Sequence, residues 1–574
     1  MFNKLFPFLT WLPSAKYTWK KDLIAGFTIG VVLIPQGIAY AILAGVPPIY
    51  GLYTALIPQI FYTFFATSKY LAVGPTALDA LIMATGISTL AIVGTEHYLT
   101  LVLVLTLMVG VIQVLLGSLR LGFVMNFVSK PVLTGFITAA AIIISISQFK
   151  NLMGLDAARS NQFYELVGNL IRNLNTLQLE SFIIGILTII IIFWLKKINK
   201  KIPAQLVVVV IGIIVIKYFY QFFSEVDIVG YVPAGLPKFA VPALTYDLFL
   251  NLLPIAFTLT FTGFLQATTI SKALEEGQMD SDLNTNKELI ALGMGNLFGS
   301  FLGSYVATGS FSRSALNKES GSLSPLSNFF AAFFIGLTLL LLTPAFYYLP
   351  KPVLAAIIIV AVVQLIKINQ IKFLWKTNKN DFFMMLITFI VTLMLGIKEG
   401  VLVGVLVSIF VVVYKSSKPH MAVLGRVPGT SHIFRNVERF SDVITDDDIL
   451  ILRFDSDLYF ANANYFKEKL DFIVKNKGQK LKSIIMDMAS INTIDSTGIA
   501  TLKEVMKKYN TKGITFYFTD IKGPVRDYIT KSLLINEIGI KNCFMNIEEA
   551  MAYLNDRRGN KHSKFSKYIE QTNI

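Results

Sequence analysis

The sequence predicts a polytopic α-helical membrane protein with a small α/β domain at its C-terminal end. Of the 574 residues, 54% are hydrophobic and 15% are charged, whereas soluble proteins carry roughly 25% charged residues. Strand-like and helix-like segments alternate only after Lys415, which is typical of an α/β domain. We therefore expect a membrane region at 22–415, preceded by a cytosolic segment, 1–21.

Long apolar stretches define the membrane region. A span needs about 17–25 apolar residues, and fewer where a helix is broken. This criterion predicts fourteen segments in two sets of seven. The first set is 22–44, 50–66, 76–93, 98–119, 129–149, 180–196 and 205–223; the second is 247–271, 288–303, 310–320, 325–343, 352–367, 381–396 and 399–415.

Lysine and arginine residues predict the orientation. Alternate connections, such as those around Lys69, Lys196 and Lys415, are basic, whereas the opposite connections contain Glu96 and Asp227. Although a few basic residues fall on the second side, the bias predicts that both termini are cytoplasmic.

Composition argues against several classes of function. Cys543 is the single cysteine, the four histidines are scattered, and no nucleophile–base pair is evident. Much of the net charge of +15 lies in short loops and the tail, as expected from membrane topology and a lipid surface. We expect no enzyme activity, cofactor, metal or nucleic-acid partner.

Residues 299–315 (GSFLGSYVATGSFSRSA) form a polar stretch between membrane-like flanks. Extended backbone at membrane depth is tolerated only where it is buried in protein or lines a cavity, and a charge such as Arg313 costs about 2.5–3.5 kcal/mol there. Ser310 and Ser312 suit the start of a half-helix, whose N–H groups and dipole attract an anion. We expect an anion site; the alternative is a cytoplasmic loop with a solvated arginine.

The third and tenth segments are interrupted at equivalent places in the two sets. Residues 70–75 (YLAVGP) precede one segment, and residues 305–310 (YVATGS) precede the other. A matching pair of broken helices indicates a transporter's binding site and suggests inverted repeats. The two N-terminal ends would then face each other near the membrane midplane.

The first segment contains a kinking proline, Pro35, next to Gln36, with Tyr40 one turn later. An amide that faces lipid would be unsatisfied, so Gln36 favours a cavity face. The alternative is a kinked helix that faces lipid.

The region after Lys415 reads as a linker, a folded domain and a tail. Pro and Gly residues predict a linker at 416–433, followed by a domain at 434–556 and a basic disordered tail at 557–574. Strands are expected at 449–454, 483–488 and 514–519, and helices at 463–474, 499–509, 524–534 and 547–555.

Five runs in the membrane region resemble the sulfate permease (SulP) family of anion transporters, which includes the solute-carrier-26 exchangers. They are PQGIAYA (35–41), GLY (51–53), AVGPTA (72–77), NKELIALG (286–293) and TGSFSRSA (308–315). The soluble region resembles a STAS domain through DLYFANAN (457–464) and IDSTG (494–498).

This resemblance implies a seven-plus-seven inverted repeat. Segments 1–4 and 8–11 would form a core domain, segments 5–7 and 12–14 a gate domain, and the protein would be a homodimer with elevator-like movement of the core. The anion would lie between the helix starts at Thr76-Ala77 and Phe311-Ser312. Gln36 and Tyr40 would line the cavity, and Arg313 would supply positive potential.

One residue departs from the family pattern. Many members carry a carboxylate, associated with H⁺ or Na⁺ coupling, where this chain has Gln266. Because an amide cannot titrate, exchange or uncoupled transport is favoured over proton symport; alternatively, Gln266 only bonds to a neighbouring helix. Asp79 is a second coupling candidate, or a partner of Arg313 or of a backbone N–H.

In the STAS-like region, Thr497 occupies the position phosphorylated in anti-sigma-factor antagonists, with Ser496 beside it. A phosphate there would interact with the following helix dipole. The simpler interpretation, which we prefer, is that Asp495-Ser-Thr caps that helix.

The function expected is secondary active transport of a small anion at the plasma membrane, sulfate first. Bicarbonate, chloride or a fumarate-like dicarboxylate are alternatives, with H⁺ or Na⁺ as a possible co-ion. Two other classes are an anion-sensing or voltage-responsive protein that signals through STAS, and a nucleobase permease. The permease would be expected to use a carboxylate, whereas this chain offers Gln266 and Arg313.

Overall fold

The structure, a computed structural model, describes residues 7–122, 129–157, 163–199, 203–243, 245–275 and 283–555. The chain divides into two compact units, Met1–Ser408 and Ile409–Ile574, and the division falls inside helix α17 (Ile397–Ser417). The expected tail at 557–574 lies outside the described residues.

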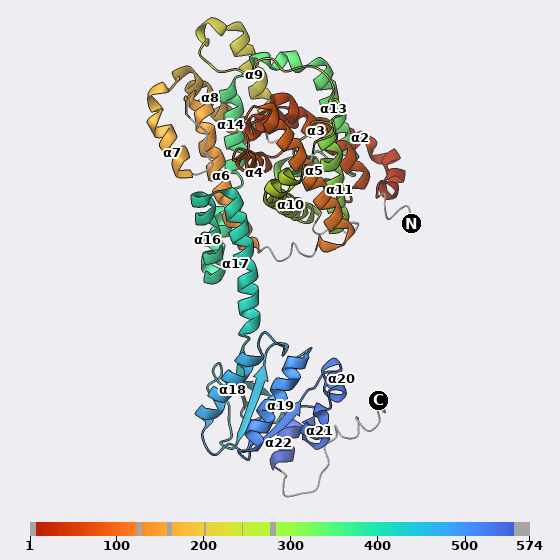
Figure 1. Cartoon of the computed structure of the whole chain (residues 1–574), viewed down its shortest axis with the longest axis vertical. Coiled ribbons are helices and arrows are strands. Elements are labelled where there is room, and N and C mark those ends of the chain that lie inside the picture. Colours follow the sequence, from red (N-terminus) through yellow and green to blue (C-terminus); the bar gives the residue numbers. More distant parts are fainter. Residues whose placement is uncertain are drawn as a thin grey trace. The chain divides into compact units, whose positions relative to one another are not determined.

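The helices of the first unit pack in two groups (Figure 1). The first group holds α2 (Phe8–Ala44), α3 (Pro48–Phe65), α4 (Ala77–Ile87), α5 (Glu96–Ser118), α10 (Tyr246–Glu275), α11 (Thr285–Phe301), α12 (Phe311–Glu319) and α13 (Leu326–Leu341), with strands β1 (Val73–Gly74) and β2 (Thr308–Gly309). The second group holds α6 (Lys130–Met153), α7 (Phe163–Arg172), α8 (Leu179–Ile198), α9 (Ala204–Tyr218), α14 (Lys351–Val363), α15 (Ile368–Thr377) and α16 (Lys379–Leu395). Short 3₁₀ turns lie at Leu174–Thr176, Tyr220–Phe222 and Thr343–Tyr348.

Contacts within each group join the two halves of the sequence. Helix α2 packs against α13, and α11 packs against both α3 and α5. In the second group, α6 packs against α14 and α16. The groups meet where α2 contacts α9 and α14, and where α4 contacts α6.

Within the described residues, six helical segments are long and apolar enough to cross a membrane. Helices α4, α9 and α13 are shorter apolar helices. The chain is thus a polytopic helical membrane protein, and its broken helices α4 and α12 are 11 and 9 residues long.

Several element boundaries differ from the sequence expectation. The first helix begins at Phe8 rather than at residue 22, and it continues through Pro13 and Pro35. Helices α7 and α15 were not expected, because each is apolar on one face only and therefore fails a test based on continuous hydropathy.

Two glycines allow α2 and α3 to touch through their backbones. A Cβ atom on Gly51 would lie 1.9 Å from the carbonyl oxygen of Gly37. Any side chain at residue 51 would therefore push the two helices apart, and α2 would no longer hold Gln36 in its present place.

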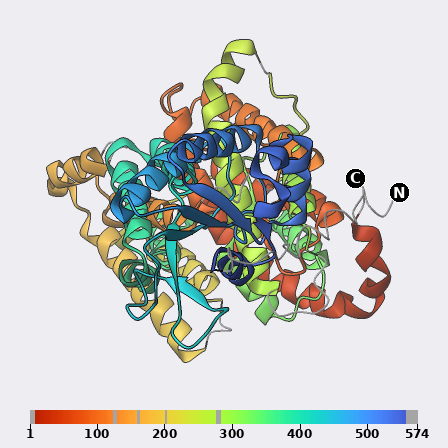
Figure 2. The ribbon, with the colours of Figure 1, turned by 90° about the horizontal axis from the view of Figure 1, so that it is seen from below.

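The second unit is a six-stranded sheet in the order β4-β3-β5-β6-β7-β8, whose arrows are coloured cyan to dark blue in Figure 2. The strands are β3 (Met421–Arg426), β4 (Phe434–Asn436), β5 (Ile449–Phe454), β6 (Ser483–Asp487), β7 (Thr515–Thr519) and β8 (Cys543–Phe544). The helices are α18 (Ala463–Lys477), α19 (Ser496–Asn510), α20 (Gly523–Lys531), α21 (Leu534–Ile538) and α22 (Ile547–Asn555), with a 3₁₀ turn at Ile540–Asn542. Strands β5 to β8 are parallel, and β3 is antiparallel to β5.

The linker expected at 416–433 is in part a strand. Strand β3 pairs with β5 along Met421–Leu424 and is mostly buried. Pro419, Pro428 and Gly429 predicted a linker from composition, but the apolar run MAVL between them supplies enough buried surface for a strand of the sheet. The folded unit therefore begins before residue 434.

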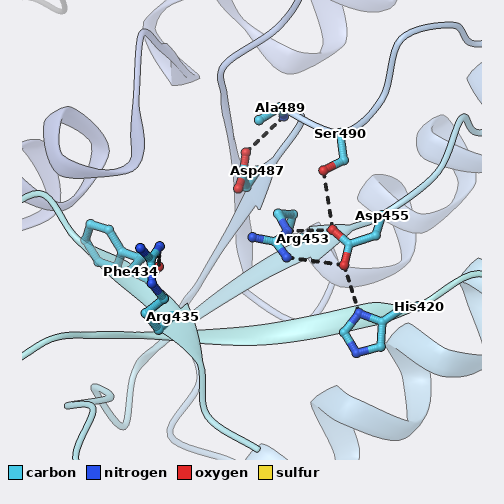
Figure 3. Close-up of polar contacts among 8 residues, drawn as sticks. All are labelled: His420, Phe434, Arg435, Arg453, Asp455, Asp487, Ala489 and Ser490. Atoms are coloured by element: carbon cyan, nitrogen blue, oxygen red, sulfur yellow. Dashed lines mark hydrogen bonds and ion pairs between the residues drawn. The ribbon is translucent and has the colours of Figure 1, made fainter. Parts of the chain in front are cut away.

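A polar cluster lies at the carboxyl ends of β5 and β6 (Figure 3). Asp455 accepts hydrogen bonds from Arg453 Nε at 2.5 Å and Ser490 Oγ at 3.3 Å, and its Oδ2 lies 2.8 Å from His420 Nδ1. Asp487 accepts a bond from the backbone N–H of Ala489 at 2.9 Å. Partial burial raises the pKa of Asp455, but the bonds with Arg453 and His420 outweigh it and lower that pKa.

Candidate functional site

Strands β1 and β2 bring the two broken helices together. They pair antiparallel, with Val73 opposite Gly309 and Gly74 opposite Thr308, and Ser310 N donates to Ala72 O at 3.1 Å. Helix α4 follows β1 closely, and α12 follows β2. The starts of both helices line one cavity.

This cavity, here called the inner cavity, has a volume of about 510 Å³. Its walls come from both helix groups. The first group contributes all seven expected site residues: Gln36, Tyr40, Thr76, Ala77, Phe311, Ser312 and Arg313. The second group contributes Lys196, Gln205 and Leu365, among others.

Arg313 is the charge at the centre of the site. Its side chain is only 1% exposed, and Nη1 donates to Gln36 Oε1 at 3.0 Å. Nε and Nη2 have no hydrogen-bond partner among the described residues. A buried guanidinium with unused donors requires an anionic or polar acceptor.

Gln36 connects Arg313 to the second helix group. Its Oε1 accepts from Arg313, and its Nε2 donates to Gln205 Oε1 at 2.8 Å. Gln205 was not among the residues expected at the site. It is an amide side chain at the start of the apolar run AQLVVVVIGIIVI, and the same feature, an amide within an apolar segment, indicated Gln36.

Asp79 binds neither of its expected partners. No ion pair with Arg313 is formed within the described chain; instead, Asp79 Oδ2 accepts from Thr76 Oγ1 at 2.6 Å and from Thr308 Oγ1. Its backbone N–H donates to Thr76 Oγ1. Asp79 therefore joins the start of α4 to strand β2, and it lies behind the cavity wall rather than on it.

Gln266 lies on α10 and lines the inner cavity. Its Oε1 is buried and has no hydrogen-bond partner among the described residues. The alternative in which this amide only bonds to a neighbouring helix gains no support from this geometry, since no donor within the described ranges bonds to the carbonyl oxygen.

The two helix starts differ in their capping. Thr76 caps α4 by accepting from Asp79 N, whereas the side chain of Ser310 makes no capping bond to α12. The first N–H groups of α12, beside Arg313, therefore receive no bond from their N-cap side chain. An uncapped helix start next to a buried cation is suited to an anion.

Buried carboxylates that the sequence analysis missed hold the loop before β1. Glu288 accepts bonds from Thr67 N, Ser68 N and the Tyr62 hydroxyl at 2.6–2.7 Å. Glu275 accepts from Ser68 Oγ at 2.6 Å. These bonds fix the loop from which β1 and then α4 start, so they shape the site without lining it.

In the second unit, Asp495 caps α19, because its Oδ1 accepts from Gly498 N at 2.7 Å. Ser496 and Thr497 are exposed on the first turn of that helix. The residue that caps this helix is thus the aspartate, and the phosphorylation expected at Ser496 or Thr497 stays a prediction.

Comparison with protein families gives two matches. The Sulfate permease family matches residues 19–388, and the STAS domain matches residues 441–550. The chain is 36% identical to "Sulfate transporter 4.1, chloroplastic" of Arabidopsis thaliana over 568 residues, which covers 96% of this chain and 82% of that protein. It is 35% identical to "Probable sulfate transporter 4.2" of the same plant, covering 96% and 83%.

Among solved structures, the chain resembles murine Solute Carrier 26 family member A9, described as an anion transporter in the inward-facing state. The TM-score is 0.89 at 25% sequence identity, and the alignment covers 96% of this chain and 94% of that one.

Proposed function

This chain belongs to the sulfate permease family, and we propose that the anion it carries across the membrane is sulfate. This family is a family of transporters and not of enzymes. The relatives named above are called sulfate transporters. The observation that carries the proposal is that the buried Nε and Nη2 of Arg313 have no acceptor in the part of the chain that the structure describes.

Sulfate suits the donors that surround the inner cavity. A guanidinium can donate two parallel hydrogen bonds to the oxygens of one oxyanion. The uncapped start of α12 adds N–H groups and the positive end of a helix dipole, and Ser312 and Thr76 lie on the same wall. Tyr40 and Phe311 complete it with aromatic surface.

We propose that the first helix group is the core and the second, with α17, is the gate of an inverted repeat. The core would carry the anion past the gate in an elevator-type movement. The support is that broken helices at matching positions are typical of alternating-access transporters. Lys196 at the inner cavity belongs to the basic connections, so we place the mouth of the cavity on the cytoplasmic side.

The coupling proposed is anion exchange or uncoupled transport. Gln266 cannot take up a proton, although its free carbonyl oxygen could help to hold Na⁺. We further propose that the protein is a homodimer in the plasma membrane. The basic connections between its segments support a cytoplasmic position for both termini.

The test is uptake of radiolabelled sulfate into liposomes that contain the purified protein. Uptake is measured with and without an inward H⁺ or Na⁺ gradient, and with bicarbonate or chloride trapped inside. We expect trapped anion, and not a proton gradient, to stimulate uptake. Sulfate binding without flux would instead support an anion sensor, and neither binding nor flux would overturn sulfate as the substrate.

Arg313→Ala tests the residue that carries the proposal. Loss of charge-assisted hydrogen bonds worth about 1.5–3 kcal/mol predicts a roughly 10- to 100-fold weaker sulfate affinity. Arg313→Lys retains the charge without the planar fork, so we expect an intermediate affinity. Arg172→Ala on α7 is the control, since Arg172 does not line the inner cavity. Wild-type affinity in Arg313→Ala, with a normal gel-filtration profile, would remove Arg313 from the site.

A further inference from the structure

We infer that Gln205 is a positioning residue and that its hydrogen bond to Gln36 is a latch between gate and core. The latch would stabilise the conformation in which the inner cavity is formed. This inference rests on the core and gate movement of the proposed function, and it assigns a role to a gate residue that lies outside the set expected to hold the anion.

The geometry is a chain of three buried side chains. Arg313 Nη1 donates to Gln36 Oε1 at 3.0 Å, and Gln36 Nε2 donates to Gln205 Oε1 at 2.8 Å. Gln36 and Gln205 are 2% and 8% exposed. All three line the inner cavity.

Gln205 anchors the Gln36 amide on the side opposite Arg313. A side-chain amide offers one accepting oxygen and one donating nitrogen, whereas a guanidinium can only donate. The oxygen of Gln36 therefore faces Arg313, and its nitrogen is left to donate to Gln205 Oε1. With a non-polar residue at position 205, Gln36 would lose this constraint, and the Nη1 donor of Arg313 would lose its preorganised acceptor.

The bond also spans the boundary between the helix groups. Gln36 lies on α2 and Gln205 is at the start of α9, and α2 contacts α9 at this boundary. A hydrogen bond fails when its heavy atoms separate beyond about 3.5 Å. Movement of α2 past α9 by more than a small displacement therefore breaks the bond, so that it belongs to one conformation of the transport cycle.

The test measures, in the absence of substrate, how often α9 separates from the helices packed against it. The reporter is Val208→Cys, because Val208 is 3% exposed and lies one turn after Gln205 on α9. Cys543→Ala removes the single native cysteine. The labelling rate with a hydrophilic maleimide in sulfate-free buffer then follows the population of conformations that expose this position.

Gln205→Leu keeps a similar volume but removes the acceptor. We expect labelling to become about fivefold faster, the effect of losing one buried hydrogen bond on a conformational equilibrium. Gln205→Glu retains an oxygen acceptor for Gln36 Nε2 and adds a charge that Arg313 attracts, so its labelling rate should not exceed that of the reporter alone.

Gln113→Leu is the matched control. Gln113 on α5 is also buried and accepts a bond from Asn296 Nδ2 on α11 at 2.9 Å, within the first helix group. We expect it to leave the labelling rate unchanged. Equal acceleration by Gln113→Leu, or none by Gln205→Leu, would overturn the latch. Accelerated labelling in a protein that moves no sulfate would support the latch while rejecting the proposed function.

Discussion

At the scale of single residues, burial decides what each polar side chain can do. Arg313 and Asp79 are both fully buried, yet their surroundings differ. Two threonine hydroxyls donate to Asp79 Oδ2, whereas Arg313 uses one donor and leaves Nε and Nη2 without partners among the described residues. The bonds of the aspartate therefore join α4 to β2, and the arginine keeps donors that an acceptor could use.

In the second unit, burial acts on the pKa of Asp520. Burial and the nearby charge of Asp487 raise the pKa of Asp520 to about 6, above the value of about 3.9 in an unfolded chain. The folded state therefore binds more protons between about pH 4 and 6, and stability falls as the pH rises through this window.

Asp520→Asn should stabilise this unit at neutral pH and remove part of its pH dependence. The gain is about 1 kcal/mol at pH 7 after allowing for solvent screening, and it disappears near pH 4. Asparagine also tolerates the left-handed backbone at this position, where φ is 55°. Urea unfolding of residues 419–555 across pH 4–8 checks this. Asp447→Asn is the control, because Asp447 is an exposed carboxylate. If the free energy of unfolding of Asp520→Asn changed with pH in parallel with that of the wild type, the raised pKa of Asp520 would be contradicted.

At the scale of elements, two-residue strands and close helix contacts place the site. Pairing of β1 with β2 puts the starts of α4 and α12 on one cavity, although the two strands are 235 residues apart in sequence (from 73 to 308). The contact of α2 with α3 at Gly37 and Gly51 holds the helix that carries Gln36 and Tyr40.

Gly51→Ala should therefore weaken both folding and the site. Its methyl group would overlap the backbone of Gly37, and overpacking of this kind costs about 1–3 kcal/mol. We expect a lower melting temperature in detergent, together with weaker sulfate binding. Gly336→Ala on α13 is the control, because a Cβ there meets only Leu56 Cδ1 at 3.7 Å. Equal melting temperatures for the two variants would show that the helices can separate without cost.

At the scale of the whole molecule, the chain consists of two units with separate hydrophobic cores. All residues that line the inner cavity lie between Thr28 and Leu365. Each face of the sheet in the second unit has its own buried cluster. All the residues that form the inner cavity therefore belong to the first unit.

A chain that ends at Lys418 should still bind sulfate. It stops after α17 and before β3, so neither core is cut. We expect a dissociation constant within about twofold of the full-length value, since independent domains fold separately. Isothermal titration calorimetry of both proteins in detergent checks this. A monodisperse truncated protein that no longer binds sulfate would show that the second unit shapes the site.

The sequence by itself determined the class of the protein and much of its fold. Sustained apolar runs predict membrane helices whatever their neighbours, because lipid exposure acts on each segment separately. The strand at 449–454 and the helix at 547–555 have the predicted bounds. The polar breaks before α4 and α12 indicated the region of the site, and all seven residues expected to bind the anion line one cavity.

Tertiary structure alone decided how these residues are used. Asp79 could have paired with Arg313, but the β1–β2 pairing brings Thr308 to it instead. Gln205 bonds to Gln36 because the fold places α9 beside α2. The composition around β3 predicts a linker, but hydrogen bonds with β5 make it a strand of the sheet. In each case the local sequence defines what a residue can donate or accept, and long-range packing selects its partner.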